Sequence, residues 1–155
     1  MSLSSDGSTV AIGTKYNDGN GNDSGHVRVF AVADVTAPTF SSAATNSDGT
    51  KVILTYSEAL SATTAAASAF TVTSGGAANA VTAVAISGST VELTLTNTVK
   101  NDQAVTVAYT DPSGSNDSNA VQDSQGNDAA DLSSTSVTNN STVEGRAFEA
   151  VSYTH

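Results

Sequence analysis

Apolar and polar residues alternate with a period of two along the middle of the chain. The clearest case is Val91, Leu93 and Leu95, which alternate with polar residues, and residues 51–56 and 105–110 repeat the pattern. Successive side chains of a β-strand point to opposite faces of a sheet, so this alternation predicts strands with one buried face.

Weaker alternation and turn signals extend this pattern to a full set of strands. We expect seven strands, at residues 39–44, 51–56, 70–73, 80–86, 90–96, 105–110 and 133–138. Seven short strands in little more than a hundred residues are typical of an immunoglobulin-like sandwich. The fold class is therefore predicted to be all-β, with Phe40, Tyr56, Phe70 and Tyr109 in the core. Residues 57–69 have fair helix propensity, for which we expect at most one or two helical turns.

The chain separates into three zones by composition. Residues 1–33 predict a β-hairpin, with strands at 9–13 and 26–32 around a polar loop. Residues 34–139 form the predicted sandwich, and residues 140–155 are expected to be a linker or a disordered tail. Because the strand number is odd, the two ends of the sandwich are predicted to lie at opposite poles.

Composition narrows the range of partners. Charged residues make up only 13% of the chain, which favours a surface of hydroxyls and amides, and the formal net charge is −10. This balance weighs against nucleic acid and anionic membranes as partners. The chain has no cysteine, so a disulfide framework and a thiol nucleophile are excluded. No apolar run is long enough to cross a membrane and no signal peptide is present, so the chain is either cytoplasmic or a piece of a longer protein.

The acidic residues concentrate in one loop between the last two predicted strands. This loop contains Asp111, Asp117, Asp123, Asp128 and Asp131, and no Lys or Arg occurs from 101 to 145. Antiparallel strands would bring the loop to the N-terminal pole, beside Glu58 and the linker residue Asp34. Carboxylates and amides are the hard oxygen ligands that calcium prefers. One reading is therefore a calcium site that stiffens the joint with a preceding domain, and the other is a set of solvated turn formers.

A second, weaker calcium candidate lies in the first zone. Asp18, Asn20 and Asn22 have the spacing of a calcium loop, but Asp23 replaces the required glycine of an EF-hand and Val29 replaces its bidentate glutamate. The alternative is an ordinary hairpin loop.

The residues that an enzyme would need are scarce. His26 and His155 are the only histidines, and the sequence contains neither a nucleophile elbow nor an HExxH, Walker or Rossmann motif. We therefore predict a protein that is not an enzyme. A carbohydrate- or glycan-binding module is the alternative, for which Tyr16, Phe148 and Tyr153 are the aromatic residues outside the predicted core.

The middle of the chain resembles a known bacterial repeat. The motifs are TAPTF at 36–40, DGTKVILTYSEAL at 48–60, VELTLT at 91–96, VTVAYTDPS at 105–113 and AVQDSQGND at 120–128. They resemble an Ig-like repeat of giant cell-surface proteins of cyanobacteria and marine bacteria, of the S-layer and adhesin type. The resemblance implies a structural or adhesive module at the cell surface. The partners that it implies are neighbouring domains of a longer chain and a surface glycan or protein.

The first zone resembles a different family. Residues 3–30 are similar to one repeat of an FG-GAP-like β-propeller. A propeller closes only with several blades, so a single repeat implies a partial propeller whose partners lie elsewhere.

Overall fold

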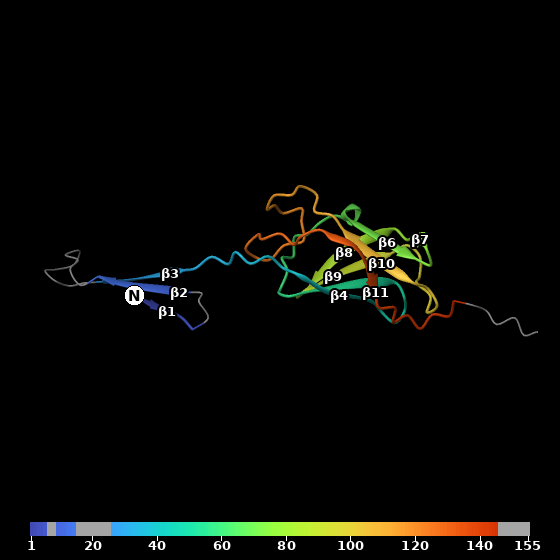
Figure 1. Cartoon of the computed structure of the whole chain (residues 1–155), viewed down its shortest axis with the longest axis horizontal. Coiled ribbons are helices and arrows are strands. Elements are labelled where there is room, and N and C mark those ends of the chain that lie inside the picture. The colour runs from blue at the N-terminus through green and yellow to red at the C-terminus, as the bar shows by residue number, and fades with distance from the viewer. Residues whose placement is uncertain (6–8, 15–25, 146–155) are drawn as a thin grey trace, which may run out of the picture. The chain divides into compact units, whose positions relative to one another are not determined.

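The structure of the protein is a computed structural model that describes residues 1–5, 9–14 and 26–145. By the contacts among its residues the chain divides into two compact units, Met1–Thr36 and Ala37–His155. The boundary falls three residues after the predicted one at 33. Figure 1 shows the strands of both units.

The second unit is a sandwich of two four-stranded antiparallel sheets. One sheet has the order β4 (Phe40–Thr45), β5 (Lys51–Tyr56), β9 (Thr90–Leu95) and β8 (Val81–Ser87). The other has the order β11 (Leu132–Val137), β10 (Val105–Tyr109), β6 (Phe70–Ser74) and β7 (Ala77–Ala78). All seven predicted strands are present, and the two-residue β7 is additional. Without β7, the order is that of an immunoglobulin-like sandwich, so the predicted fold class is confirmed.

The alternation of the sequence becomes the division between core and surface. In β5 and β9 every second residue is buried, and Val52, Leu54, Val91 and Leu93 have no exposed surface at all. The predicted aromatic residues also lie in or against the core, where Phe70 and Tyr109 pack with ring centroids 5.1 Å apart. Full burial of one such aliphatic side chain contributes about 1.5–3 kcal/mol, so these strands hold the two sheets together.

Residues 57–69 contain little helix. A single 3-10 turn, η1 (Ala67–Ala69), directly precedes β6, and it is the one helical element in the part of the chain that the structure describes. The predicted limit of one or two helical turns is confirmed.

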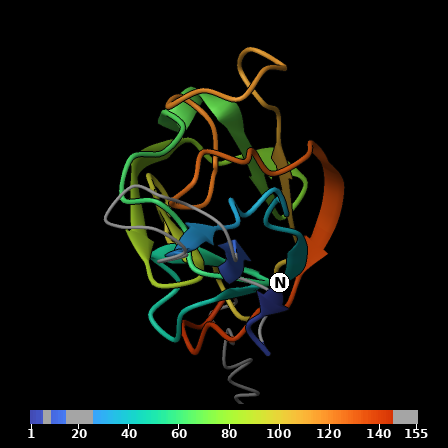
Figure 2. The same ribbon diagram turned by 90° about the vertical axis from the view of Figure 1, so that its left-hand side faces the viewer.

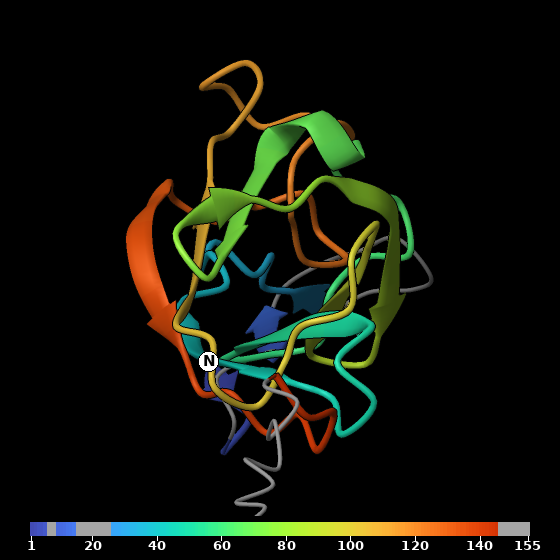
Figure 3. The same cartoon turned by 90° about the vertical axis from the view of Figure 1, so that its right-hand side faces the viewer.

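The strand directions define two ends of the sandwich. We call the end at which β4 begins the entry pole (Figure 2) and the opposite end the exit pole (Figure 3). β5 ends at the entry pole because Tyr56 pairs with Phe40. β11 runs parallel to β4, through the bridge between Ala44 and Thr138, and therefore ends at the exit pole. The sandwich thus begins and ends at opposite poles, as predicted.

The segment that follows β11 is not the linker that the composition predicts. Ser141 is buried, and its hydroxyl donates to the carbonyl of Val99 at 2.7 Å. The N–H of Thr142 donates to the carbonyl of Ser47 at 2.8 Å, and the N–H of Asn101 donates to the carbonyl of Val143 at 2.8 Å. Polar composition alone suggests a linker, but residues 140–145 form hydrogen bonds with the sandwich. Residues 146–155 lie outside the described part.

The first unit contains a three-stranded antiparallel sheet in the order β1 (Ser2–Leu3), β2 (Thr9–Thr14) and β3 (His26–Ala31). The predicted hairpin of β2 and β3 is confirmed, and the short β1 is additional. All large apolar side chains that are exposed among the described residues belong to this unit.

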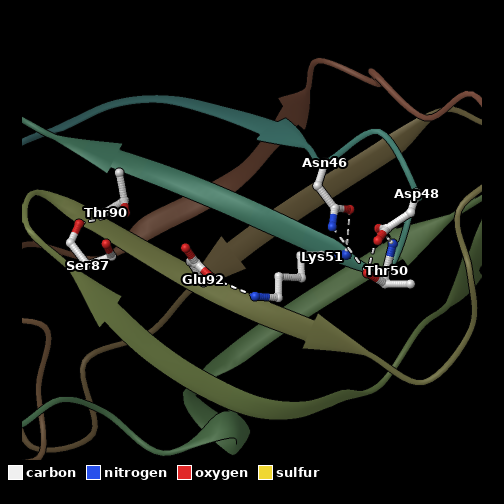
Figure 4. Close-up of polar contacts among 7 residues, drawn as sticks. All are labelled: Asn46, Asp48, Thr50, Lys51, Ser87, Thr90 and Glu92. Atoms are coloured by element: carbon white, nitrogen blue, oxygen red, sulfur yellow. Dashed lines mark hydrogen bonds and ion pairs between the residues drawn. The ribbon is translucent and has the colours of Figure 1, made fainter.

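The turn between β4 and β5 is held by side chains that Figure 4 shows. The amide of Asn46 accepts the N–H of Lys51 at 2.9 Å, and Asp48 accepts the N–H of Thr50 at 3.1 Å. The hydroxyl and N–H of Thr50 hold the pKa of Asp48 below its usual value. Gly49 completes the turn with a φ of 69°, in the left-handed region. A Cβ on this residue would overlap the carbonyl oxygen of Val99.

We expect Gly49→Ala to lower the free energy of unfolding by about 2–5 kcal/mol, the sum of a left-handed alanine and an overpacked contact. Gly88→Ala is the matched control, because Gly88 has a φ of 59° but nothing within 4 Å of its Cβ position. It should cost only about 1–2 kcal/mol. Urea unfolding measures both, and equal losses would contradict the packing argument.

Candidate functional site

The acidic loop between β10 and β11 lies where the strand directions predict it. The N–H of Ser61 donates to the carbonyl of Gln122 at 2.8 Å, and Leu60 forms an antiparallel bridge with Asp123. The loop therefore runs beside the segment that follows β5 at the entry pole. Carboxylate oxygens of Glu58 and Asp123 lie within 4.8 Å of each other.

Asp123 is the most buried carboxylate of the loop, with 2% of its surface exposed. One of its oxygens accepts the N–H groups of Gln125 and Asn127 at 2.8 and 2.9 Å, and the other accepts the amide of Asn127 at 2.8 Å. Burial favours the neutral acid, but these hydrogen bonds together outweigh it and hold the pKa of Asp123 below its usual value. Asp123 is therefore ionised, and it organises the turn at 123–127.

Two further candidate residues form turns of the same kind. Asp111 accepts the N–H of Ser113 at 3.2 Å, and Asp117 accepts the N–H of Asn119 at 2.6 Å. Asp117 is also hydrogen-bonded to the hydroxyl of Ser113, and this bond, with the Asn119 N–H, holds the pKa of Asp117 below its usual value. An acceptor two residues before its donor is an Asx turn. Asp111, Asp117 and Asp123 therefore each form an Asx turn, an arrangement that is compatible with either reading of the loop.

Asp128 has a different environment. One oxygen accepts the N–H of Asp117 at 3.0 Å, whereas the other is buried and has no hydrogen-bond partner in the described part of the chain. Burial first, and then the negative charges of Asp111, Asp117 and Asp123, raise the pKa of Asp128. The loop thus contains a carboxylate whose ionisation its neighbours oppose.

The remaining predicted ligands stand apart from this loop in the sequence. Asp34 belongs to the first unit, where it accepts the N–H of Thr36 at 2.9 Å in another Asx turn. Asp18, Asn20 and Asn22 lie outside the described residues, as do the aromatic candidates Tyr16, Phe148 and Tyr153. The weaker calcium loop and the aromatic glycan contacts therefore stay predictions.

The lysines of the described sandwich are attached at the exit pole, opposite the acidic loop. Lys51 and Lys100 are its two cationic side chains within the described part. Lys51 opens β5 at the exit pole and pairs with Glu92 on β9 at 2.7 Å, which raises the pKa of Lys51 (Figure 4). Lys100 lies in the exit-pole loop between β9 and β10. Within the described sandwich, no lysine or arginine belongs to the acidic loop or to the entry pole.

The anchor of the acidic loop is a residue that sequence reasoning assigned only to the core. The hydroxyl of Tyr109 accepts the N–H of Val121 at 2.9 Å, in a buried hydrogen bond. Burial, above all, raises the pKa of Tyr109 to about 12. Alternation shows that Tyr109 points inward, but the partner of its hydroxyl lies twelve residues away and carries no sequence signal.

We expect Tyr109→Phe to lower the free energy of unfolding by about 1–3 kcal/mol, because the buried N–H of Val121 loses its acceptor. Tyr56→Phe is the matched control, since the hydroxyl of Tyr56 is buried without a hydrogen-bond partner in the described part of the chain. Its removal should cause no loss. Chemical denaturation distinguishes the two, and a Tyr56→Phe loss as large as that of Tyr109→Phe would be the opposite result.

The fold and the pole define an immunoglobulin-like module with an acidic loop at one end. Residues 33–114 match the model of the SWM repeat, described as a flagellar system-associated repeat. The match covers 82 of the 155 residues, more than half of the chain. The chain therefore belongs to this repeat family. The expected resemblance to a repeat is confirmed, whereas the family model does not extend to residues 1–32, so the FG-GAP-like resemblance stays a prediction.

Two solved structures share the fold. The N-terminal part of the bacterial S-layer protein SbsC aligns with a TM-score of 0.54 and 22% identity, over 68% of this chain and 24% of that one. A longer fragment, rSbsC(31-844), aligns with a TM-score of 0.50 and 23% identity, over 66% of this chain and 14% of that one. The chain thus corresponds to a small part of either structure. No curated protein matches it. Among the described residues no helix is long and apolar enough to span a membrane.

Proposed function

We propose that this chain is a non-enzymatic structural module of a larger bacterial cell-surface protein. Membership of a repeat family supports this proposal, because a repeat functions in series with neighbouring domains. The fold that it shares with part of an S-layer protein is a second support. In this role its partners are the neighbouring domains of the same longer chain.

The observation that carries the proposal is the position of the two ends of the sandwich. β4 begins at the entry pole, and the chain leaves at the exit pole after residues 138–145. A module whose chain enters at one end and leaves at the other adds its full length to a row of domains. A chain that is poor in charged residues and rich in hydroxyls is compatible with this role.

A surface location predicts that antibodies raised against the chain label intact cells of the organism that produces it. We also expect protease treatment of intact cells to remove the epitope, because the module lies outside the cell envelope. Immunofluorescence before and after permeabilisation is the measurement, with an antibody against a cytoplasmic protein as the control. Labelling only after permeabilisation would overturn the surface assignment.

We further propose that calcium binds at the entry pole and stiffens the joint with the preceding segment. Glu58 and Asp123 have carboxylate oxygens within 4.8 Å of each other. Both lysines of the described sandwich belong to residues at the exit pole. Two carboxylates at this separation repel each other, and a divalent cation relieves the repulsion. Asp34, three residues before the sandwich unit, is the further carboxylate ligand that the sequence predicts for this site.

The calcium proposal predicts a higher thermal midpoint in calcium than in EDTA. A ligand that binds only the native state at a hundred times its dissociation constant adds about 2.7 kcal/mol. Magnesium should have less effect, because it demands tighter octahedral geometry. Glu58→Gln should abolish the shift without removing the hydrogen bonds of Asp123.

Asp102→Asn is the control for the calcium experiment. It removes the same charge from an exposed residue in the loop between β9 and β10, at the exit pole. This variant should keep the whole calcium shift. A midpoint that does not respond to calcium, or an equal loss of response in both variants, would rule out the entry-pole site.

Glycan binding is the alternative function, and a surface glycan or protein as a further partner also stays a prediction. Binding to a glycan array, with loss of binding in variants of Tyr16, Phe148 or Tyr153, is the result that would support it.

A further inference from the structure

The first and last strands of the sandwich contact each other although they belong to different sheets. β4 is an edge strand of one sheet and β11 is an edge strand of the other. The N–H of Thr45 donates to the carbonyl of Thr138 at 2.9 Å, and the N–H of Thr138 donates to the carbonyl of Ala43 at 2.9 Å. These bonds join the two sheets along one side.

The direction of the two strands determines how this contact responds to tension. β4 and β11 are parallel at this bridge, and the chain reaches β4 from the entry pole and leaves β11 toward the exit pole. Tension along the chain therefore pulls the two strands in opposite directions along their own axes. Bonds between strands that slide past each other are loaded together, whereas bonds in a hairpin opened at its free end break one after another.

Side chains reinforce the bridge just beyond β11. Thr45 has 3% of its surface exposed, and its hydroxyl donates to the amide oxygen of Asn139 at 3.1 Å and accepts the N–H of Asn140 at 2.7 Å. The amide of Asn139 donates to the carbonyls of Lys100 and Gln103 at 2.7 and 2.9 Å. One threonine and one asparagine thus tie the end of β4 to the start of the C-terminal segment and to the loop between β9 and β10.

The contact continues to residue 145. The N–H and the hydroxyl of Thr142 both donate to the carbonyl of Ser47, at 2.8 and 2.9 Å. The N–H of Gly145 donates to the side chain of Asn101 at 3.3 Å. Figure 3 shows this segment, in red, at the end of the sandwich that carries the turn between β4 and β5.

We propose that the contacts of residues 43–47 with residues 138–142, which we call the terminal clamp, are the mechanical lock of this module. Under tension the clamp must break before either sheet loses a strand. The proposal rests on the proposed function, because only a module in series with other domains carries tension. It assigns a role to the C-terminal segment, whose composition predicted a linker.

Because the chain has no cysteine, a pair of introduced cysteines determines the two points at which force is applied. In the terminal geometry, the full chain carries Val35→Cys and Glu144→Cys, both at exposed positions on either side of the sandwich, and is held between DNA handles at constant force. In the hairpin geometry, it carries Ala80→Cys and Thr96→Cys, which lie where β8 begins and β9 ends and are joined by the bond from Thr96 N–H to the Ala80 carbonyl. The clamp predicts a longer lifetime in the terminal geometry at the same force.

Thr45→Val tests the clamp itself, because it keeps the branched shape but removes the hydroxyl. In the terminal geometry we expect it to shorten the lifetime about tenfold, which corresponds to about 1.4 kcal/mol of barrier. Thr106→Val is the matched control, since it removes the 2.7 Å hydroxyl contact between Thr73 and Thr106 in the other sheet. This control should leave the terminal lifetime within about twofold of the parent protein, a change of about 0.4 kcal/mol.

Three results would overturn the clamp. They are equal lifetimes in the two geometries, an unchanged terminal lifetime in Thr45→Val, and an equal shortening by Thr45→Val in both geometries, which would reveal a general loss of stability. If Thr45→Val does not fold, Thr142→Val removes one exposed hydroxyl of the clamp and takes its place. Surface labelling tests the proposed function separately, so failure of one experiment is distinguishable from failure of the other.

Discussion

The structure depends on the burial of one face of each sheet against the other. Val52 and Leu54 of β5 meet Val91 and Leu93 of β9 within one sheet, and the second sheet adds Val107. None of these five side chains has exposed surface. A polar group that is buried without a partner costs free energy, and this cost determines where the loops attach. The hydrogen bond from Val121 N–H to the Tyr109 hydroxyl is one result, and the burial of Asp123 among N–H donors is another.

The carboxylates therefore have a structural role before any role in binding. Asp34, Asp48, Asp111, Asp117 and Asp123 each accept the N–H of the residue two positions later. An ionised carboxylate suits this task because it accepts several hydrogen bonds at once. The proposed calcium site uses the carboxylate lone pairs that these hydrogen bonds leave unused. Glu58 is not one of these five acceptors, so its variants leave the five Asx-turn hydrogen bonds in place.

The two poles of the module differ in their chemistry. The entry pole carries the acidic loop. The exit pole carries both lysines of the described sandwich, the left-handed Gly49 and the C-terminal segment of residues 138–145. In a row of such modules the acidic end of one would face the less acidic end of the next. The exit pole also holds the terminal clamp, so hydrogen bonds join the two sheets near the point where the chain leaves the sandwich.

The sequence by itself determined the strands, their inward faces and the pole of the acidic loop, since alternation, turn residues and strand parity are local properties of the chain. Residues 90–95 illustrate this, because their pattern of burial repeats their pattern of polarity. Tertiary structure decided the role of residues 140–145, the partner of the Tyr109 hydroxyl and the contact of Thr45 with Asn139. These features depend on which polar groups meet across long separations in sequence. A threonine or an asparagine has the same local signal in a linker as in a clamp, and only the partner distinguishes the two.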